Sequence, residues 1–264
     1  MPESLFLSLG ALAERFSQSR NVFLFLDFDG TLVPIRDRPS ECFLAEDVRH
    51  TLSQLSSIPP LKVGIISGRA LSDLRDRVGL QQVVLAGNHG LEIEGPGFAY
   101  CEQHAKYLSV ELRELVNRIG QELQRFAGAW VEDKKLSASV HFRQVNPAEH
   151  SHVRDVVQQV TAAAVAQRRF ILRPGKQVVE IRPAVGWNKS NALHWIVERM
   201  SKLPSPDVIY FGDDTTDEDV FTEWPTAITV SVGNHHETAA RFSVADHDEV
   251  HRSLLWMLKV FRNQ

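Results

Sequence analysis

The chain has 264 residues, of which 43% are apolar and 23% charged, and its net charge at pH 7 is −4. This apolar fraction supports a substantial core and excludes a disordered chain. The mild net charge gives no reason to expect a nucleic-acid or membrane partner. We therefore expect a globular protein whose partner is a small neutral or anionic metabolite.

The cysteine content and the N-terminal residues indicate the cellular compartment in which we expect the protein. Cys42 and Cys101 show neither C-x-x-C nor metal-type spacing, which favours a reduced, cytoplasmic setting. A short secretory signal would carry positive charge where Glu3 stands, so a packed amphipathic helix is the better interpretation. Its apolar residues recur at helical spacing, at Leu5, Leu9, Leu12 and Phe16. No apolar run approaches the ~20 residues that span a bilayer.

Strands and helices alternate through much of the chain. Residues 22–26 are apolar at every position, as in a strand buried on both faces. The expected strands cover residues 22–26, 62–66, 83–86, 208–211, 226–232 and 241–245. The expected helices cover residues 45–56, a stretch ending near 77, 189–200 and 249–261. This rhythm predicts an α/β fold with a doubly wound parallel-sheet, Rossmann-like core, whose ligand site lies beyond the carboxyl ends of the strands.

The pattern changes in the middle of the chain. A helix at 104–126, strands at 130–133 and 137–143, a helix at 150–167 and strands at 168–173 and 177–183 follow in that order. We predict an inserted α+β cap domain at 96–183 and a catalytic core made of 1–95 and 184–264. A single continuous fold with a decorated sheet stays open as an alternative.

Two carboxylates, Asp27 and Asp29, follow the first buried strand. Burying two acids side by side is unfavourable unless a cation or a shared proton compensates them. A D-x-D pair alone is common in turns, but five apolar residues before it and Gly-Thr-Leu after it indicate a functional site.

Two further segments fit an anion. Ser67-Gly68-Arg69 ends the second strand and opens a helix, whose N–H groups favour negative charge, although an ordinary serine cap has the same pattern. Lys189 begins another predicted helix, where the helix dipole does not favour a cation and a bound anion would explain the charge. Taken singly, Lys189 also fits a solvated surface lysine.

Residues 213–219 contain five acids in seven positions. Such oxygen-rich clusters suit Mg²⁺. An EF-hand is excluded because Glu218 stands where that loop needs glycine. The dipole of a following helix explains Glu218 and Asp219, so Asp213 is the best candidate metal ligand.

These segments, in this order, resemble the motifs of the haloacid-dehalogenase (HAD) superfamily. Within it, the chain is similar to the trehalose-6-phosphate phosphatase family from residue 23 to about 232. The likeness is carried by LDFDGTL, SGR, AGNHGLE, VEDKKLSASVHFR, GKQVVEIRP and FGDDTTDEDVF. It implies a phosphatase that uses Mg²⁺ to hydrolyse trehalose 6-phosphate to trehalose and phosphate, and we expect a monomer.

The resemblance also implies roles for the motif residues. Asp27 would attack phosphorus, and Asp29 would protonate the departing sugar oxygen and then activate water. The implied metal ligands are Asp27, the backbone carbonyl of Asp29, Asp213 and Asp214, with Asp214 or Asp217 acting through water. The implied phosphate ligands are Thr31, Ser67, Gly68, Arg69 and Lys189.

By the same resemblance, the insert is the family's cap, which binds the sugar. Glu132, Lys134 and Glu180 are expected to hydrogen-bond the distal glucose, because charge-assisted bonds suit hydroxyl groups. The other implied substrate-binding residues are His89, His141, Arg143 and Lys176. Without the resemblance, the charged run at 132–135 would be a solvated turn.

Two details qualify the resemblance. Asn188 and Ser190 stand beside Lys189 where the family often has Asp and Gly, which puts the entry into that helix in question. Four histidines near the C-terminus could suggest a zinc site, namely His235, His236, His247 and His251. Their spacing matches no recognised set of zinc ligands, so we do not expect a zinc site there.

Two alternative functions stay open. The first is hydrolysis of another sugar phosphate, such as sucrose phosphate or glucosylglycerol phosphate, under a differently lined cap. The second is a sugar-phosphate sensor without turnover. A sensor would be expected to lack a reacting group, whereas the full set is present, namely Asp27, Asp29, Ser67, Lys189 and Asp213.

Overall fold

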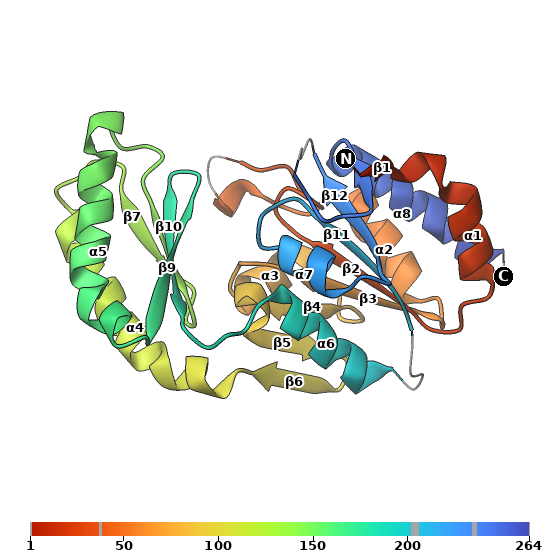
Figure 1. The fold of residues 1–264 in the computed structure, drawn as a ribbon, viewed down its shortest axis with the longest axis horizontal. Helices are drawn as coiled ribbons and strands as arrows, with labels where there is room; N and C mark the ends of the chain where they lie inside the picture. Colours follow the sequence, from red (N-terminus) through yellow and green to blue (C-terminus); the bar gives the residue numbers. More distant parts are fainter. Residues whose placement is uncertain (1, 37–38, 202–205, 234–236, 264) are drawn as a thin grey trace. The chain divides into compact units, whose positions relative to one another are not determined.

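The protein is described by a computed structural model that covers residues 2–36, 39–201, 206–233 and 237–263. The chain divides into two compact units (Figure 1). The core unit combines Met1–Tyr100 with Asn188–Gln264, and the insert unit is Cys101–Trp187. The expected insert, 96–183, overlaps the second of these. None of the described helices has the length and apolar character to cross a membrane.

A nine-stranded sheet forms the centre of the core unit, in the order β1-β13-β12-β11-β2-β3-β4-β5-β6. Its strands are β1 (Glu3–Ser4), β2 (Val22–Asp27), β3 (Leu61–Ile66), β4 (Val84–Gly87), β5 (Glu92–Gly95), β6 (Phe98–Cys101), β11 (Asp207–Gly212), β12 (Ile228–Val232) and β13 (Phe242–Val244). Neighbours from β1 through β4 pair in parallel, while β5 pairs antiparallel with β4. The prediction of a doubly wound α/β fold is confirmed. The antiparallel strand β5 at one side of the sheet was not predicted.

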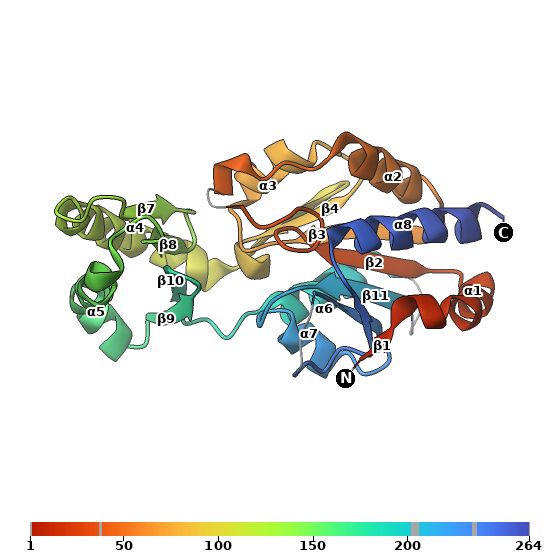
Figure 2. The same cartoon turned by 90° about the horizontal axis from the view of Figure 1, so that it is seen from above.

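Helices cover both faces of this sheet (Figures 1 and 2). They are α1 (Leu9–Ser17), α2 (Glu46–Ser56), α3 (Leu71–Val78), α6 (Lys189–Met200), α7 (Glu218–Glu223) and α8 (His247–Arg262). Figure 2 shows α2 and α3 on one side of the sheet and α6 and α7 on the other. The amphipathic N-terminal helix is confirmed from Leu9 as α1, in which Leu12 and Phe16 are buried against the core. Leu5, which was expected in the same helix, lies in a separate 3-10 helix, Leu5–Leu7.

The central strand β2 is apolar because both of its faces are buried. Val22, Leu24 and Leu26 join the core cluster that includes residues of α2, α3 and α8. Phe23 and Phe25 point the other way and stack on each other with centroids 5.8 Å apart. A strand with two covered faces cannot alternate polar and apolar residues, which explains the uninterrupted run.

Strand register brings the sequence motifs to one edge of the sheet. Asp27 at the end of β2 lies opposite Ile66 of β3, and Leu26 lies opposite Phe211 of β11. The strand order runs outward from β2 to β3 and β4 on one side and from β11 to β12 and β13 on the other. Asp27 therefore stands at the topological switch point, where ligands bind in open α/β sheets.

The insert unit has its own antiparallel sheet, in the order β7-β8-β10-β9. Its elements are α4 (Gln103–Leu123), β7 (Trp130–Asp133), β8 (Ala138–His141), α5 (His150–Ala166), β9 (Phe170–Gly175) and β10 (Val178–Pro183). Inward residues of β8 and β10, such as Val140 and Ile181, pack with the apolar stripe of α4 and α5. The predicted order of elements is confirmed.

Helix α6 begins with a complete capping box. The Asn188 side chain accepts a 2.9 Å hydrogen bond from the Asn191 backbone N–H, and the Asn191 side chain accepts one of 2.9 Å from the Asn188 N–H. Ser190 is buried and accepts a hydrogen bond from Trp224 Nε1 at 3.1 Å. Asn188 and Ser190 thus each have a structural partner, and Lys189 still begins the helix.

We expect Asn188→Ala to lower the free energy of unfolding by about 1 kcal/mol, because it removes the side-chain acceptor at the helix start. Asn188→Asp keeps an acceptor there and should remain close to the wild type. Urea unfolding of the two variants measures the difference. An alanine variant as stable as the aspartate variant would contradict this role of the cap.

Candidate active site

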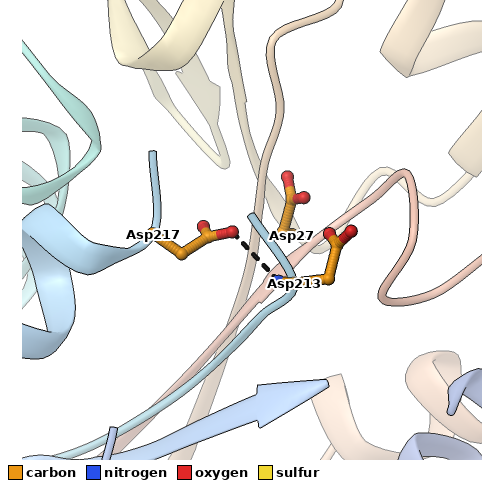
Figure 3. Close-up of side chains that lie close together, drawn as sticks. All are labelled: Asp27, Asp213 and Asp217. Carbon is orange, nitrogen blue, oxygen red and sulfur yellow. Dashed lines mark hydrogen bonds between the residues drawn. The ribbon is translucent and has the colours of Figure 1, made fainter. Parts of the chain in front are cut away.

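Three buried or half-buried carboxylates converge at the edge of the sheet. Asp27 ends β2, while Asp213 and Asp217 lie in the loop between β11 and α7 (Figure 3). One carboxylate oxygen from each lies within 4.8 Å of the others. Asp27 is 5% exposed and Asp217 is fully buried.

Two glycines make this convergence possible. Gly30 has a φ of +86°, and a Cβ at that position would collide with the Asp213 carboxylate. A Cβ at Gly212 would likewise collide with the Asp217 side chain. The carboxylates can approach because the backbone at both positions carries no side chain. Thr31, next to Gly30, places its Oγ1 3.4 Å from Asp213 Oδ1.

Asp217 fixes the shape of the acidic loop. Its Oδ2 accepts hydrogen bonds from the backbone N–H groups of Asp213 and Asp214, each at 3.0 Å. Figure 3 shows the bond from Asp213. Its Oδ1 accepts from Lys189 Nζ at 2.7 Å and from the Tyr210 hydroxyl. Because both oxygens are engaged by the protein, Asp217 serves to hold its neighbours in place.

Lys189 connects Asp217 to Asp27. Its Nζ lies 3.1 Å from Asp27 Oδ1, and the side chain is 2% exposed. Burial by itself would lower the pKa of the ammonium, but the Asp217 and Asp27 carboxylates raise that pKa well above its ordinary value. Lys189 therefore stays charged beside Asp27.

The cluster carries more negative charge than Lys189 can balance. Burial is the main cause that raises the pKa of Asp27 well above its usual range; the Lys189 charge opposes it, and the Asp217 and Asp213 charges add to it. Burial and the neighbouring acids raise the pKa of Asp213 to about 7. Oxygen donors with excess negative charge are the set that a hard divalent cation requires, so these residues fit such an ion.

Asp29 is held by Arg69. The guanidinium donates from Nε and Nη2 to the two carboxylate oxygens, each at 2.6 Å. It also donates to Asp73 at 2.8 Å and to the Pro39 carbonyl at 3.0 Å. The predicted phosphate ligand Arg69 is thus engaged mainly with acids of the core unit, as a bidentate pair with one of the predicted catalytic residues.

Ser67, Gly68 and His89 lie together beyond β3 and β4. The Ser67 carbonyl accepts a hydrogen bond from the His89 backbone N–H at 2.9 Å, and Ser67 Oγ accepts from the Arg69 N–H at 3.2 Å. A Cβ at Gly68 would lie 2.6 Å from the His89 ring, so a larger residue here would have to displace that ring. His89 itself has a φ of +57°, in the left-handed region. The structure thus places His89 beside the predicted phosphate-binding loop.

Asp214 differs from its acidic neighbours. It is exposed, and its Oδ1 accepts hydrogen bonds from the Thr216 N–H and hydroxyl. Partial desolvation favours the protonated acid, but the Lys189 charge and the Thr216 bonds outweigh it and lower the pKa of Asp214. Among the described residues, the close carboxylate group contains Asp27, Asp213 and Asp217, and it includes neither Asp29 nor Asp214.

The insert unit gathers most of the predicted sugar-binding residues. Glu132, Ser139 and Glu180 lie opposite one another across β7, β8 and β10. His141 Nε2 lies 2.9 Å from Glu132 Oε2, and Lys134 Nζ lies 3.4 Å from Glu180 Oε1. Glu132 and His141 therefore form a polar pair within one sheet, and Glu180 of that sheet pairs with Lys134 of the turn between β7 and β8.

The remaining predicted residues occupy other positions. Arg143 follows β8 and Lys176 lies in the turn between β9 and β10, and both are exposed. His235 and His236 lie outside the described residues. His251 of α8 contacts Thr51 and Asp47 of α2, at 3.1 and 3.7 Å, which gives it a structural place between two helices.

The model of the trehalose-phosphatase family matches residues 25–249. The chain belongs to the trehalose-phosphatase family. The probable trehalose-phosphate phosphatase E of Arabidopsis thaliana is 34% identical over 250 residues, covering 89% of this chain and 69% of that protein.

Solved structures share the fold. A trehalose-6-phosphate phosphatase related protein superposes with a TM-score of 0.81 at 23% identity, over 91% of this chain and 99% of the other. A haloacid dehalogenase-like hydrolase from Bacteroides thetaiotaomicron gives a TM-score of 0.62 at 16% identity, over 90% and 99%. The resemblance to this family and to the HAD fold is confirmed.

Sequence reasoning missed one residue of this family member's site, Tyr210. The residue is fully buried in β11, and its hydroxyl donates to the same Asp217 oxygen that binds Lys189. The sequence did contain a signal: Tyr210 is a tyrosine in an otherwise apolar strand, and a buried tyrosine hydroxyl requires a hydrogen-bond partner.

We expect Tyr210→Phe to reduce kcat by roughly 3- to 10-fold, because loss of about 1 kcal/mol of hydrogen bonding loosens Asp217 and Lys189. KM should change less than kcat. Phosphate release measured over a range of substrate concentrations separates the two. Tyr107→Phe, at an exposed tyrosine of α4, is the matched control. Equal kinetics for both variants would show that the Tyr210 hydroxyl does not position the site.

Proposed function

We propose that the protein hydrolyses trehalose 6-phosphate to trehalose and phosphate through an aspartyl-phosphate at Asp27. Family membership makes the chain a phosphoric monoester hydrolase. The observation that carries the proposal is Asp27 at the switch point of the sheet, held 3.1 Å from a buried lysine and close to Asp213. That setting keeps a carboxylate oriented beside positive charge, as a nucleophile toward a phosphoryl group needs.

In this proposal, Asp27 attacks phosphorus and the sugar oxygen departs with a proton from Asp29. Asp29 then accepts a proton from the water that cleaves the aspartyl-phosphate. Arg69 donates a hydrogen bond to each of the two Asp29 carboxylate oxygens, so Asp29 must leave Arg69, at least in part, before one of these oxygens can pass a proton to the sugar oxygen. Arg69 thereby acts on the acid more directly than on phosphate.

The residues fit Mg²⁺, with Asp27, Asp213 and the Asp29 backbone carbonyl as ligands. When bound, the ion supplies charge neutralisation for the phosphoryl group. Asp214, exposed and ionised, is better suited than Asp217 to act through water, since Asp217 is engaged on both oxygens. Phosphate oxygens are bound by Thr31, Ser67, Gly68 and Lys189.

We infer that the insert unit is the cap that selects the sugar. The support is the sheet that aligns Glu132 and Glu180, with Lys134 and His141 as their partners. Charge-assisted hydrogen bonds from these groups suit the hydroxyls of a glucose ring. Arg143 and Lys176, exposed in the same unit, and His89 in the core unit complete the proposed substrate set.

A cytoplasmic monomer remains our expectation. This expectation rests on the sequence, whose two cysteines, Cys42 and Cys101, show neither C-x-x-C nor metal-type spacing. Size-exclusion chromatography with light scattering measures the oligomeric state.

The substrate is tested by phosphate release from a panel of sugar phosphates with and without Mg²⁺. The panel includes trehalose 6-phosphate, sucrose phosphate and glucosylglycerol phosphate. We expect kcat/KM for trehalose 6-phosphate to exceed the others by more than about 10-fold, or 1.4 kcal/mol. A higher kcat/KM for another sugar phosphate would identify that compound as the substrate instead. Binding of a sugar phosphate without any Mg²⁺-dependent turnover would indicate a sensor.

Asp27→Asn tests the nucleophile. The amide keeps the shape of the side chain but cannot form the acyl-phosphate, so we expect kcat to fall by roughly 10³-fold or more. Thermal unfolding of the variant checks that the fold is intact. Turnover above a tenth of the wild-type rate in a folded variant would rule out covalent catalysis at Asp27.

The raised pKa of Asp213, about 7, predicts how Mg²⁺ affinity depends on pH. Below that pH the metal-free carboxyl carries a proton that the ion must displace, so affinity should fall by up to about 10-fold per pH unit. Calorimetry at pH 8, 7 and 6, in buffers of different ionisation enthalpy, counts the released protons. An affinity that does not change between pH 8 and 6 would be inconsistent with this titration.

A further inference from the structure

The insert unit carries an aromatic side chain that the proposed mechanism does not use. Trp130 begins β7 and lies directly opposite His141 in the antiparallel pairing with β8. The two rings stack, with centroids 4.1 Å apart and planes 13° from parallel. The indole is therefore fixed in orientation by its neighbour.

The alternation of side chains decides which face of the sheet Trp130 occupies. Val131 and Val140 pack in the apolar core with α4 and α5. Because neighbouring residues of a strand point to opposite faces, Trp130, Glu132 and His141 lie on the other face. This is the face that also carries Glu180, through the pairing Glu132–Ser139–Glu180.

The indole is covered on one side and exposed on the other. His141 stacks on one ring face, and β7 stands at the end of the strand order β7-β8-β10-β9. Trp130 remains 44% exposed. A single exposed aromatic residue is ordinary on a protein surface. Here, however, the ring stacks on an imidazole and stands in one row with charged groups.

The stacking partner is fixed in turn. His141 Nε2 lies 2.9 Å from Glu132 Oε2, which sets the plane of the imidazole under the indole. Glu132 thus both faces the sheet surface and orients the aromatic pair. A flat apolar surface and carboxylates are thereby presented side by side on a rigid strand.

This combination matches the two kinds of surface on a hexose. Hydroxyl groups around the ring bind carboxylates and ammonium groups, whereas the C–H face of the ring is apolar and packs on a flat aromatic surface. A tryptophan supplies that area with few side-chain torsions to immobilise. Ligand sites commonly combine aromatic walls with a few placed polar groups.

We propose that Trp130 is a specificity-determining residue whose exposed ring face stacks on a hexose ring of the sugar phosphate. The His141–Glu132 pair holds the indole for this contact. The inference rests on the proposed function for the identity of the sugar, but it requires only that the substrate contain a hexose.

The test compares two substrates in steady-state kinetics: the sugar phosphate that the wild type hydrolyses best, and acetyl phosphate, which has no sugar or aromatic ring. Trp130→Ala should raise KM for the sugar phosphate by about 3- to 10-fold, the range for one lost aromatic contact. Kinetics with acetyl phosphate should stay within about twofold of wild type, since the chemistry does not involve the indole. Trp130→Phe keeps a smaller aromatic face and should recover most of the loss.

Tyr107→Ala is the matched control, because Tyr107 is also an exposed aromatic residue beside a histidine of the insert unit. It is 77% exposed on α4, with its ring centroid 6.1 Å from that of His104. This variant should behave as the wild type with both substrates. A second measurement compares the fluorescence change that the dephosphorylated sugar of that preferred substrate causes in the wild type and in Trp130→Phe, which should respond less.

The outcomes separate this inference from the proposed function. A wild type that prefers another hexose phosphate overturns the trehalose 6-phosphate assignment alone, and the comparison continues with that substrate. An unchanged KM in Trp130→Ala, or equal losses with both phosphates, overturns the role of Trp130 alone. An identical fluorescence response in the wild type and Trp130→Phe overturns it as well.

Discussion

The ion pairs of one buried lysine organise the acidic cluster of the core unit. Lys189 lies 2.7 Å from Asp217 and 3.1 Å from Asp27, so it joins the acidic loop after β11 to the end of β2. Asp217 in turn holds that loop through two backbone N–H groups and the Tyr210 hydroxyl. A single ammonium cannot balance the clustered acids. Burial, and in addition the neighbouring acids, raise the pKa values of Asp27 and Asp213. The site therefore suits a cation and an anionic substrate. Burying unbalanced acids is unfavourable, and a bound cation would reduce that unfavourable energy.

Backbone constraints make the cluster possible before any ligand arrives. The parallel register of β2, β3 and β11 brings their carboxyl ends together, and the switch point leaves space between them. Gly30 and Gly212 then allow carboxylates to approach the chain where a Cβ would collide with them. In the insert unit, a different constraint operates, because the alternation of the antiparallel sheet sends one set of residues into the core and aligns Glu132 with Glu180 on the other face. Both units thus position functional groups through strand geometry.

Much of this could be predicted from the sequence, because strong periodicity and buried strands leave clear patterns. The run at 22–26 and the helix starting at Lys189 were predicted closely, as was the order of elements in the insert. The β5–β6 hairpin was missed, since its strands are four residues each and carry too short a pattern. Motif position indicated that Arg69 lies near the site, but not that its guanidinium faces Asp29, a pairing across 40 residues that only the folded chain defines. Tyr210 was hidden for a similar reason: its partner lies in the following loop, and the surrounding strand is apolar.

The most direct measurement of the central claim is a crystal structure of the protein with Mg²⁺ and beryllium fluoride, which mimics an acyl-phosphate. The account predicts the fluoride adduct on the Asp27 carboxylate, with Asp27 and Asp213 bound to one metal ion at 2.0–2.1 Å, the usual distance for Mg²⁺. Lys189 should contact the adduct while keeping its bond to Asp217. An adduct elsewhere, or Asp27 and Asp213 too far apart to share an ion, would contradict the account.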